Sequence, residues 1–391
     1  MFNKASIHFY YFLILFLSVS CSYDTKDQTR LTPDFQIDIS LNDIKKNIKY
    51  SDFIDQYDFV KLETSENSLI GSIDEIRCSK QYIFILDMFI SKGVFQFDRK
   101  GRFIRRVGKV GEGPGEYTSP ISFTIHEKKS KIFILDNRQK ILCFNFDGGY
   151  IEQIRSKGFL TEKIELLDDN RWAFIGGGTE DHVVMADSQL NKIKSYLPFL
   201  NRATSALIPN AIFKLGEDIL VRRDYLDTVY AVTKTEIRPH IIFNFKDKSL
   251  PFEMIAKNQE NPSITALSND YCIVRFYYEL KDYIYLGFIH KSNAYIVNYN
   301  KLNRSGILFS FNDIKDDITF LDNKFNSYIV GVDLITSRFI YKVETQDFIQ
   351  GVESAQKQHA EGEAFIKARG LAKQLKTDDN PVLMFAKYAN F

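Results

Sequence analysis

Apolar and polar positions along the chain repeat at a regular spacing. The segment IFILDMFISKGVFQFD (Ile83–Asp98) returns 49 residues later as IFILDNRQKILCFNFD (Ile132–Asp147), with eight of the sixteen positions identical. Each copy begins with four apolar residues, a pattern expected of a strand buried on both faces, and ends in an alternating Phe-x-Phe-Asp stretch. The repeat therefore predicts a unit built from short strands.

The residues around the first copy complete a four-stranded unit. SIDEIRCS (Ser72–Ser79) precedes the apolar run and is predicted to be an innermost strand. YIFILD and VFQFD follow as the second and third strands, and FIRRV, after the turn RKGR, is a more polar outer strand. Four antiparallel strands in a unit that recurs every roughly 40–50 residues are typical of one β-propeller blade.

Degenerate copies continue the repeat along the chain. The same frame returns at Trp172–Asp187, Asp218–Thr233 and Tyr283–Asn300. SYIVGVD (Ser327–Asp333) begins a sixth unit, and its partner strand is expected at the end of the chain in PVLMFAKY (Pro381–Tyr388). We therefore expect six blades.

The two ends of the chain are expected to meet in the last blade. YDFVKLET (Tyr57–Thr64) is a predicted strand with no unit of its own, and it would pair as the outer strand beside Pro381–Tyr388. Such closure leaves no blade edge open. The predicted fold class is all-β, a six-bladed β-propeller with N-/C-terminal strand closure.

A segment of different composition interrupts the sixth unit. Glu344–Lys376 is rich in Ala, Glu, Gln and Lys and predicts one or two amphipathic helices, broken near Gly362 or Gly370. We expect this helical insertion to pack on one face of the propeller. Its apolar positions are Phe348, Val352, Phe365, Ile366, Leu371 and Leu375.

The N-terminus has the features of a targeting segment. Lys4 precedes an apolar run, Phe9–Leu17, that is short for a membrane span and fits a signal-peptide core, and small residues then lead to Cys21. This arrangement resembles a bacterial lipobox, although Ser18 stands where leucine is more usual. A secretory signal cut near Cys21 is the alternative. We expect a signal at 1–21 with lipidation of Cys21, a tether and lead-in at 22–54 and the propeller at 55–391.

Composition excludes some classes of function. Lys+Arg is 51 and Asp+Glu is 50, a formal net charge of +1, so the chain lacks the basic surface that a nucleic-acid binder needs. Cys78, Cys143 and Cys272 are far apart and lie in apolar runs, which indicates buried thiols, although one disulfide is possible. No cysteine or histidine pair has metal-ligand spacing, and neither a cofactor nor a metal is expected.

The glycine-rich stretch RRVGKVGEGPGEYTSP (Arg105–Pro120) lacks the lysine and helix of a phosphate-binding loop and is predicted to be a crossover between two blades. Asp87 and Asp136 occupy equivalent positions in two units. Equivalence favours a structural role, in which each carboxylate accepts backbone N–H bonds in the loop after its strand, over a catalytic one.

The strongest departures from the repeat are VRRDYLD (Val221–Asp227) and IVRFYYEL (Ile273–Leu280). Arginine, tyrosine and acidic side chains can bind a glycan or a peptide through stacking and paired hydrogen bonds. The alternative is that these are solvated blade edges with extended arginines. The candidate ligand-binding residues are Arg222, Arg223, Asp224, Arg275, Tyr277, Tyr278 and Glu279.

Several of these motifs carry a family resemblance. IFILD…VFQFD, the linker GEGPGEY, DTVY at Asp227–Tyr230 and the terminal DDNPVLMFAKY resemble six-bladed β-propeller lipoproteins of Bacteroidetes, relatives of NHL-repeat propellers. The resemblance covers about residues 55–391. It implies an outer-membrane lipoprotein that faces the periplasm or the cell surface, and it transfers no catalytic residue.

The expected function is a binding module, anchored in the membrane at Cys21, for an extracellular glycan, peptide or protein partner. Two alternatives stay open. The first is a propeller hydrolase or lyase acting on glycans, which needs acids that converge at the propeller axis. The second is a structural subunit of an envelope complex, which predicts a large apolar patch around Glu344–Lys376.

Overall fold

In the computed structural model, all the strands and helices described lie in one compact unit, Pro33–Phe391. Cys21 and Asp224 lie outside the described residues. The structure describes residues 32–155, 158–176, 181–198, 211–223, 225–251, 254, 264–321 and 327–389.

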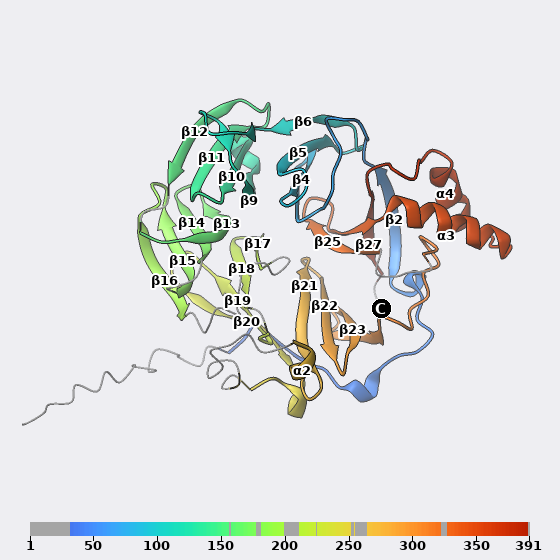
Figure 1. Ribbon diagram of the computed structural model, residues 1–391. Coiled ribbons are helices and arrows are strands. Elements are labelled where there is room, and N and C mark those ends of the chain that lie inside the picture. Colours follow the sequence, from blue (N-terminus) through green and yellow to red (C-terminus); the bar gives the residue numbers. More distant parts are fainter. Residues whose placement is uncertain are drawn as a thin grey trace, which may run out of the picture. The chain divides into compact units, whose positions relative to one another are not determined.

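Six sheets, each built from four antiparallel strands and one of them extended by a parallel strand, surround a central channel, which confirms the six-bladed β-propeller (Figure 1). From the channel outward, blade 1 holds β3 (Glu75–Cys78), β4 (Tyr82–Asp87), β5 (Gly93–Asp98) and β6 (Phe103–Val107). Blade 2 holds β9 (Pro120–His126), β10 (Lys131–Asp136), β11 (Lys140–Asn145) and β12 (Tyr150–Arg155) in the same order. Blade 3 holds β13 (Thr161–Asp168), β14 (Arg171–Gly176), β15 (Asp181–Asp187) and β16 (Lys192–Pro198).

The other three blades follow the same plan, again from the channel outward. Blade 4 holds β17 (Ile212–Leu215), β18 (Asp218–Arg222), β19 (Thr228–Val232) and β20 (Ile237–Asn244), with β1 (Phe35–Asp38) as a fifth strand. Blade 5 holds β21 (Ile273–Glu279), β22 (Tyr283–His290), β23 (Asn293–Asn300) and β24 (Ser305–Ser310). Blade 6 holds β25 (Ser327–Asp333), β26 (Arg338–Val343), β27 (Val382–Tyr388) and β2 (Ile54–Lys61).

The second strand of a blade is apolar on both faces because it is packed between two neighbouring blades. On β4, Ile83 and Ile85 join a core cluster with residues of blade 6, whereas Phe84 and Leu86 join a cluster with residues of blade 2. All four side chains are fully buried. Alternate positions of one strand therefore serve two interfaces.

The ends of the chain close blade 6 as expected, because β2 pairs antiparallel with β27, with Phe59 opposite Met384. The predicted partner of Ser327–Asp333 was wrong. That segment is the innermost strand β25, and it pairs with β26, which in turn pairs with β27. β26 escaped prediction because Lys342 interrupts its apolar pattern, although this side chain is buried and its ammonium lies 2.5 Å from Glu344.

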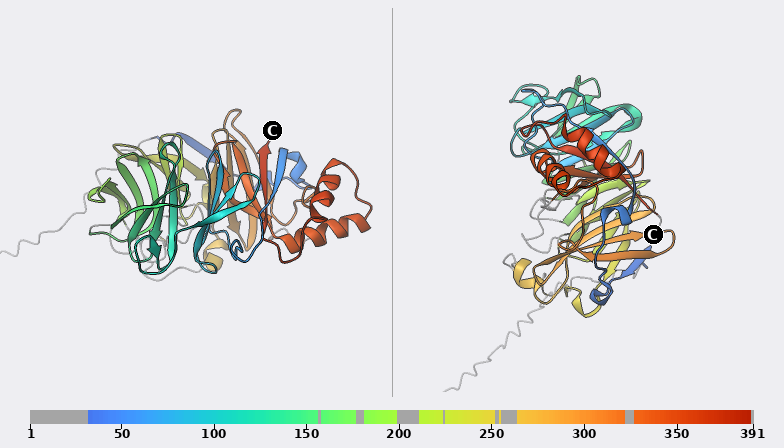
Figure 2. Two further views of the ribbon diagram at one scale, coloured as in Figure 1. Left: turned by 90° about the horizontal axis from the view of Figure 1, so that it is seen from above. Right: turned by 90° about the vertical axis from the view of Figure 1, so that its right-hand side faces the viewer.

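The insertion forms two helices, α3 (Thr345–Lys357) and α4 (Glu363–Ala372), separated at Gly362, whose φ of 103° favours glycine. The helices lie outside β2 at the rim of blade 6, and not on a propeller face as expected (Figures 1 and 2). The ring of Phe348 on α3 lies 5.4 Å from that of Phe59 on β2. Ile366 was expected to be buried and is 70% exposed, because it follows the buried Phe365 by one position on the helix.

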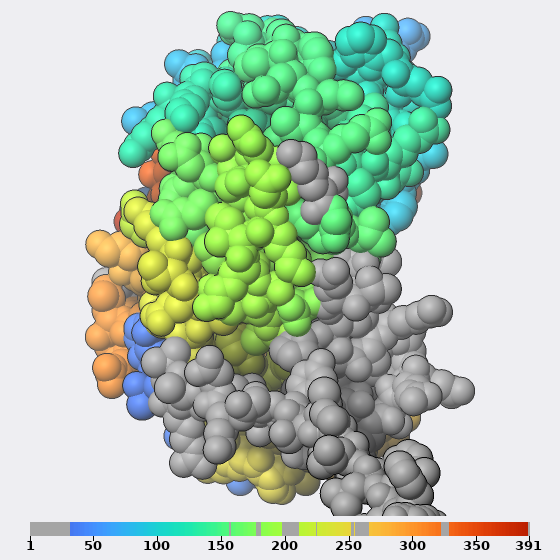
Figure 3. Space-filling model, turned by 90° about the vertical axis from the view of Figure 1, so that its left-hand side faces the viewer, coloured from blue at the N-terminus to red at the C-terminus, as the bar shows by residue number. Residues whose placement is uncertain are grey.

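The N-terminal lead-in contains a strand that the sequence did not predict. β1 pairs in parallel with β20 at the outer edge of blade 4, with Phe35 opposite Ile241. In the space-filling view of Figure 3, blue atoms of this N-terminal part lie beside the yellow atoms of blade 4. The lead-in therefore covers an edge that would otherwise be unpaired.

The glycine-rich stretch joins β6 of blade 1 to β9 of blade 2, as a crossover should. Within it, β7 (Lys109–Val110) and β8 (Glu116–Tyr117) form a short parallel pair. The Glu116 carboxylate accepts the Gly113 N–H at 2.8 Å and lies 2.9 Å from the Lys109 ammonium. The Glu116 carboxylate therefore stabilises the crossover loop.

The structural role predicted for Asp87 and Asp136 is confirmed. Asp87 accepts the backbone N–H groups of Gly71 and Ile90 at 2.7 and 2.9 Å. Asp136 accepts that of Thr118 at 2.8 Å. Both carboxylates tie the loop before the innermost strand to the end of the second strand.

Candidate functional site

Equivalent positions of the first three innermost strands carry polar side chains toward the channel. The strand registers align Glu75, Ser122 and Lys163 at one level of the channel, since they face Leu86, Leu135 and Ile175 on the second strands. Arg77, Thr124 and Glu165 align in the same way at the next level, two residues further along each strand. The period of two directs all six toward the same face.

At each of the two levels, a charged residue of blade 1 pairs with an oppositely charged residue of blade 3, and a small residue of blade 2 lies between them in the ring. The Lys163 ammonium forms an ion pair with Glu75, and one level down Arg77 lies 3.6 Å from Glu165. Ser122 donates to Glu75 at 3.3 Å, and Thr124 donates to Glu165. Blade 2 thus offers only short hydroxyl side chains, and the long charged side chains of blades 1 and 3 meet in front of it.

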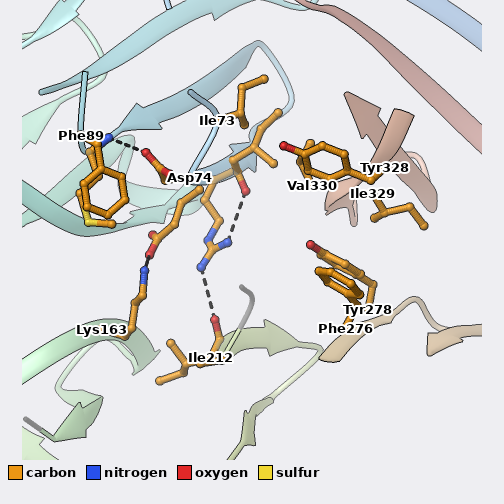
Figure 4. Close-up of a pocket in the computed structure, with 15 residues that line it drawn as sticks. Ile73, Asp74, Phe89, Lys163, Ile212, Phe276, Tyr278, Tyr328, Ile329 and Val330 are labelled. Atoms are coloured by element: carbon orange, nitrogen blue, oxygen red, sulfur yellow. Dashed lines mark hydrogen bonds and ion pairs between the residues drawn. The ribbon is translucent and has the colours of Figure 1, made fainter. Parts of the chain in front are cut away.

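A cavity of about 280 Å³ opens at the first of these levels. We call it the channel-mouth cavity (Figure 4). Figure 4 shows Lys163 on one side of it and Phe276, Tyr278 and Tyr328 on the other. The residues that line it are Ile73, Asp74, Glu75, Ile76, Arg77, Met88, Phe89, Lys163, Ala211, Ile212, Phe276, Tyr278, Tyr328, Ile329 and Val330.

The wall opposite the charges is aromatic and partly open to solvent. Phe276 of blade 5 is 40% exposed and Tyr328 of blade 6 is 39% exposed. Phe89, in the loop after β4, is 61% exposed at the same cavity. Large apolar side chains exposed together around a concavity are typical of a binding site.

Burial also changes the acid–base properties of the channel. Desolvation raises the pKa of Glu165 above its usual range, although Arg77 and the Thr124 hydroxyl oppose this shift. Burial likewise raises the pKa of Tyr278, which stays a neutral phenol. Burial therefore disfavours the charged form of both side chains, and Tyr278 adds a neutral hydroxyl group to the channel.

A second, larger cavity of about 480 Å³ lies against blades 5 and 6, and we call it the inter-blade cavity. It shares Phe276, Tyr278, Tyr328 and Ile329 with the channel-mouth cavity. Its lining residues are Arg275, Phe276, Tyr278, Tyr285, Gly287, Phe288, Ile289, Ala294, Tyr295, Ile296, Phe311, Tyr328 and Ile329.

A third cavity of about 220 Å³ lies further along the channel. Arg77 and Ile76 line both this cavity and the channel-mouth cavity. Leu334 and Ile335, in the turn between β25 and β26, are 44% and 46% exposed at its edge. Arg77 and its ion pair with Glu165 therefore lie between the two ends of the channel.

Of the seven residues predicted from sequence, Arg275 and Tyr278 line these cavities. Arg222 and Arg223 are 1% and 3% exposed, so the alternative of solvated blade edges is wrong for them. Arg222 donates to the carbonyls of Val274 and Arg275 at 3.2 and 3.0 Å and so ties blade 4 to blade 5. Burial lowers the pKa of Arg223 to about 10.

Tyr277 and Glu279 belong to a buried network between blades 4 and 5. Tyr277 donates to the Glu279 carboxylate, which is fully buried and also accepts from Lys301 at 2.6 Å. His240 Nε2 lies 3.1 Å from both Glu279 oxygens, and its Nδ1 lies 2.8 Å from Asp34. The structure therefore separates these two residues from Arg275 and Tyr278, and a ligand-binding role for them stays a prediction.

The charged channel residues Glu75, Arg77, Lys163 and Glu165 were missed from the sequence. A signal was present, because EIR in the first innermost strand and KIE in the third carry reversed charges at equivalent positions. It becomes visible only when the strands that precede each apolar run are aligned with one another.

No candidate metal cluster occurs in the part of the chain that the structure describes, where no three His, Cys, Asp or Glu side chains are grouped to hold an ion. Cys78, Cys143 and Cys272 are free thiols, and burial raises their pKa to about 12, 11 and 12. Among the described residues, no helix has the length and apolar character needed to cross a membrane.

Comparison with known proteins identifies a family and a fold. The family described as "Domain of unknown function (DUF4934)" matches residues 34–387. A protein of Bacteroides fragilis NCTC 9343 that is named as exported has 20% identity and a TM-score of 0.72, over 91% of this chain and 100% of its own. No curated protein matches the sequence.

Two further solved structures are more distant. A protein of unknown function from Bacteroides caccae has 11% identity and a TM-score of 0.41, over 65% of this chain and 93% of its own. BamB from Moraxella catarrhalis has 10% identity and a TM-score of 0.39, over 84% and 86%. Neither likeness carries an inference about function.

Proposed function

The chain belongs to the DUF4934 family, and we propose that it is an exported binding protein whose channel mouth receives an extracellular ligand. The observation that carries this proposal is the two-sided channel-mouth cavity. Charged side chains of blades 1 and 3 form one side, and the partly exposed Phe276 and Tyr328 form the other. A cavity with an apolar wall and a few convergent polar groups is typical of a ligand site.

Binding is better supported than catalysis because each acid at the cavity already has partners. Glu75 pairs with Lys163 and accepts the Phe123 N–H at 3.2 Å. Asp74 accepts the Met88 N–H and the Ser72 hydroxyl, both at 2.7 Å. A glycoside hydrolase needs two carboxyl groups available to the substrate, one of them as an acid. The hydrolase or lyase alternative therefore requires these bonds to break first.

We further propose a lipid anchor at Cys21 and a place in the outer membrane, with the propeller facing the periplasm or the cell surface. The signal-like N-terminus supports this proposal, and so does the exported name of the Bacteroides fragilis protein. The rival role as a structural subunit receives less support. That role predicts a large apolar patch at residues 344–376, but Ile366 is the one large apolar side chain that is strongly exposed in this segment.

A thermal-shift screen of the full chain in lipid nanodiscs tests the binding proposal. The panel would hold oligosaccharides, peptidoglycan fragments and short peptides. A ligand at a hundred times its dissociation constant stabilises a protein by about 2.7 kcal/mol. We expect one class to raise the unfolding midpoint of the wild type.

The same ligand should have a weaker effect on Phe276→Ala, which removes an exposed ring from the cavity wall. Ile366→Ala removes an apolar side chain of α4 that is more exposed than Phe276 and lies away from the cavity, and it serves as the control. A ligand that stabilises the wild type and Phe276→Ala equally would place binding elsewhere and contradict the proposal. Cleavage of a bound glycan would favour the hydrolase or lyase instead.

A further inference from the structure

The inter-blade cavity is formed by specific departures from regular sheet structure. β21 has a bulge between Val274 and Phe276, and β25 has one between Ile329 and Gly331. Bulges redirect side chains, and here both occur in the innermost strands that face the cavity. On the neighbouring strand β22, Gly287 leaves space for Phe276, since a Cβ at this position would lie 2.9 Å from its ring.

The lining of the inter-blade cavity selects for an apolar group. Seven of its thirteen lining residues are Phe or Tyr, and the rings of Phe288 and Tyr295 are stacked with their centroids 5.3 Å apart. A sugar there would have to bury hydroxyl groups with few hydrogen-bond partners, which is unfavourable. An aromatic or large aliphatic group would instead gain apolar contacts on several sides.

The adjoining channel-mouth cavity is lined by charges of both signs, of which Glu75 and Lys163 are already paired with each other. Glu75 and Asp74 are acidic, Lys163 and Arg77 are basic, and all four line it. Figure 4 shows Phe276, Tyr278 and Tyr328 on the side opposite Lys163, and these three residues also line the inter-blade cavity. The two cavities therefore adjoin at these rings, and a ligand that spans the rings would contact both.

A peptide combines these chemical features. It has polar groups and charges of both signs along its backbone and termini, and its side chains can be large and apolar. A fatty acid has an apolar chain but only one charge, and a glycan has no large apolar group. The adjoining cavities, one apolar and one lined by charges of both signs, thus favour a peptide.

We propose that the ligand of this site is a peptide segment that lies across the channel-mouth cavity and inserts one large apolar side chain into the inter-blade cavity. This inference rests on the proposed function, because it names the ligand class of the same site. The specificity would come from the inserted side chain, with Phe276 at the junction of the two cavities.

Matched peptides test the proposal by isothermal titration with the full chain in nanodiscs. The probes are acetylated Ala-Lys-X-Glu-Ala peptides in which X is Phe, Leu or Ala. Burial of the larger side chain should make the Phe and Leu peptides bind about tenfold more tightly than the Ala peptide, or better. Decanoate, with empty nanodiscs as background, tests the fatty-acid alternative.

Two phenylalanines of the channel-mouth cavity provide the variant and its control. Phe276 lines both cavities, whereas Phe89 lines only the channel-mouth cavity, and both rings are partly exposed, so their removal should spare the fold. Phe276→Ala should abolish the preference for Phe over Ala. Phe89→Ala should weaken all three peptides equally and keep the preference.

Three results would overturn the inference. They are equal binding of the three peptides, binding of decanoate but no peptide, and a preference that survives Phe276→Ala. Under each of them the proposed function still stands if any compound of the thermal-shift panel stabilises the wild type more than it stabilises Phe276→Ala. If no panel member does, the proposed function fails as well.

Discussion

The network around Glu279 should make stability depend on His240 in a pH-dependent way. Asp34 and Glu279 are acceptors when ionised, and each faces a different ring nitrogen of His240, so the imidazole must be doubly protonated to donate to both. Burial opposes this protonation, but these two carboxylates raise the pKa of His240. His240 and Lys301 together lower the pKa of Glu279 against its own burial. The perturbation is His240→Leu.

The size of the effect follows from what remains bonded to Glu279. Removal of one partner of a buried ion pair costs about 3–5 kcal/mol when the other charge is left alone. Here Lys301 and Tyr277 still bond Glu279, so we expect a loss at the lower end, about 3 kcal/mol at pH 6. His126→Gln is the control, because His126 pairs with the exposed Asp169 and such surface pairs contribute little to stability.

The sign of the pH dependence follows from the direction of each pKa shift. The raised pKa of His240 stabilises the fold fully below the ordinary value of 6.5, and this contribution is lost as the pH rises through the raised value. The lowered pKa of Glu279 stabilises the fold above 4.5, and this contribution is lost as the pH falls through the lowered value. The difference between wild type and His240→Leu should therefore be largest between these limits and shrink at higher pH.

Urea unfolding followed by fluorescence of Trp172, which is buried and is the one tryptophan of the chain, measures this difference. Unfolding free energies would be compared at pH 6 and at successive pH values up to 9. A difference between wild type and His240→Leu that is constant over this range, or that grows with pH, would show that the charged form of His240 does not stabilise the fold.

Four further predictions concern other parts of the molecule. Lys163→Met should lower the free energy of unfolding by about 2–3 kcal/mol because it leaves the Glu75 carboxylate without its cation. Adding Glu75→Gln should recover part of the loss in the same urea assay, and purely additive effects in the double variant would contradict the ion pair. Asp87→Ala should cost about 1–3 kcal/mol in that assay, since it removes a buried carboxylate that accepts two backbone N–H bonds. An unchanged midpoint would contradict the structural role. Gly351→Ala should expose the amides of α3 to faster hydrogen exchange, because the new Cβ would lie 2.2 Å from the Phe320 carbonyl oxygen; unchanged exchange would show that the contact can relax. Cys21→Ser should move the protein from the membrane to the soluble fraction, and continued membrane association after carbonate washing would contradict the lipid anchor.

The blades were predictable because their signal is local and repeated. A second strand packed between two neighbours is apolar at nearly every position, as β4 shows, and the pattern recurs in each unit. β26 was missed because Lys342 is a buried charge whose partner lies outside the strand. β1 was missed because its pairing with β20 joins segments about two hundred residues apart, and no local pattern records such a pairing.

The site was less predictable than the fold for the same physical reason. Arg275 and Tyr278 were found because they depart from the repeat, and the structure places both at cavities. Departure from the repeat did not distinguish these two residues from Tyr277, Glu279 and Arg222, whose hydrogen bonds connect blades 4 and 5. Glu75 and Lys163 are 88 residues apart in sequence, and only ring closure brings their charges together.

Difference hydrogen exchange can locate ligand binding at the channel mouth. The full chain would be compared with and without the Phe-containing peptide, and exchange would be followed by mass spectrometry. We expect new protection in the innermost strands around Glu75–Arg77, Phe276–Tyr278 and Tyr328–Val330, with little change elsewhere. Protection confined to α3 and α4 or to the outer strands, with the channel mouth unchanged, would contradict binding at the channel mouth.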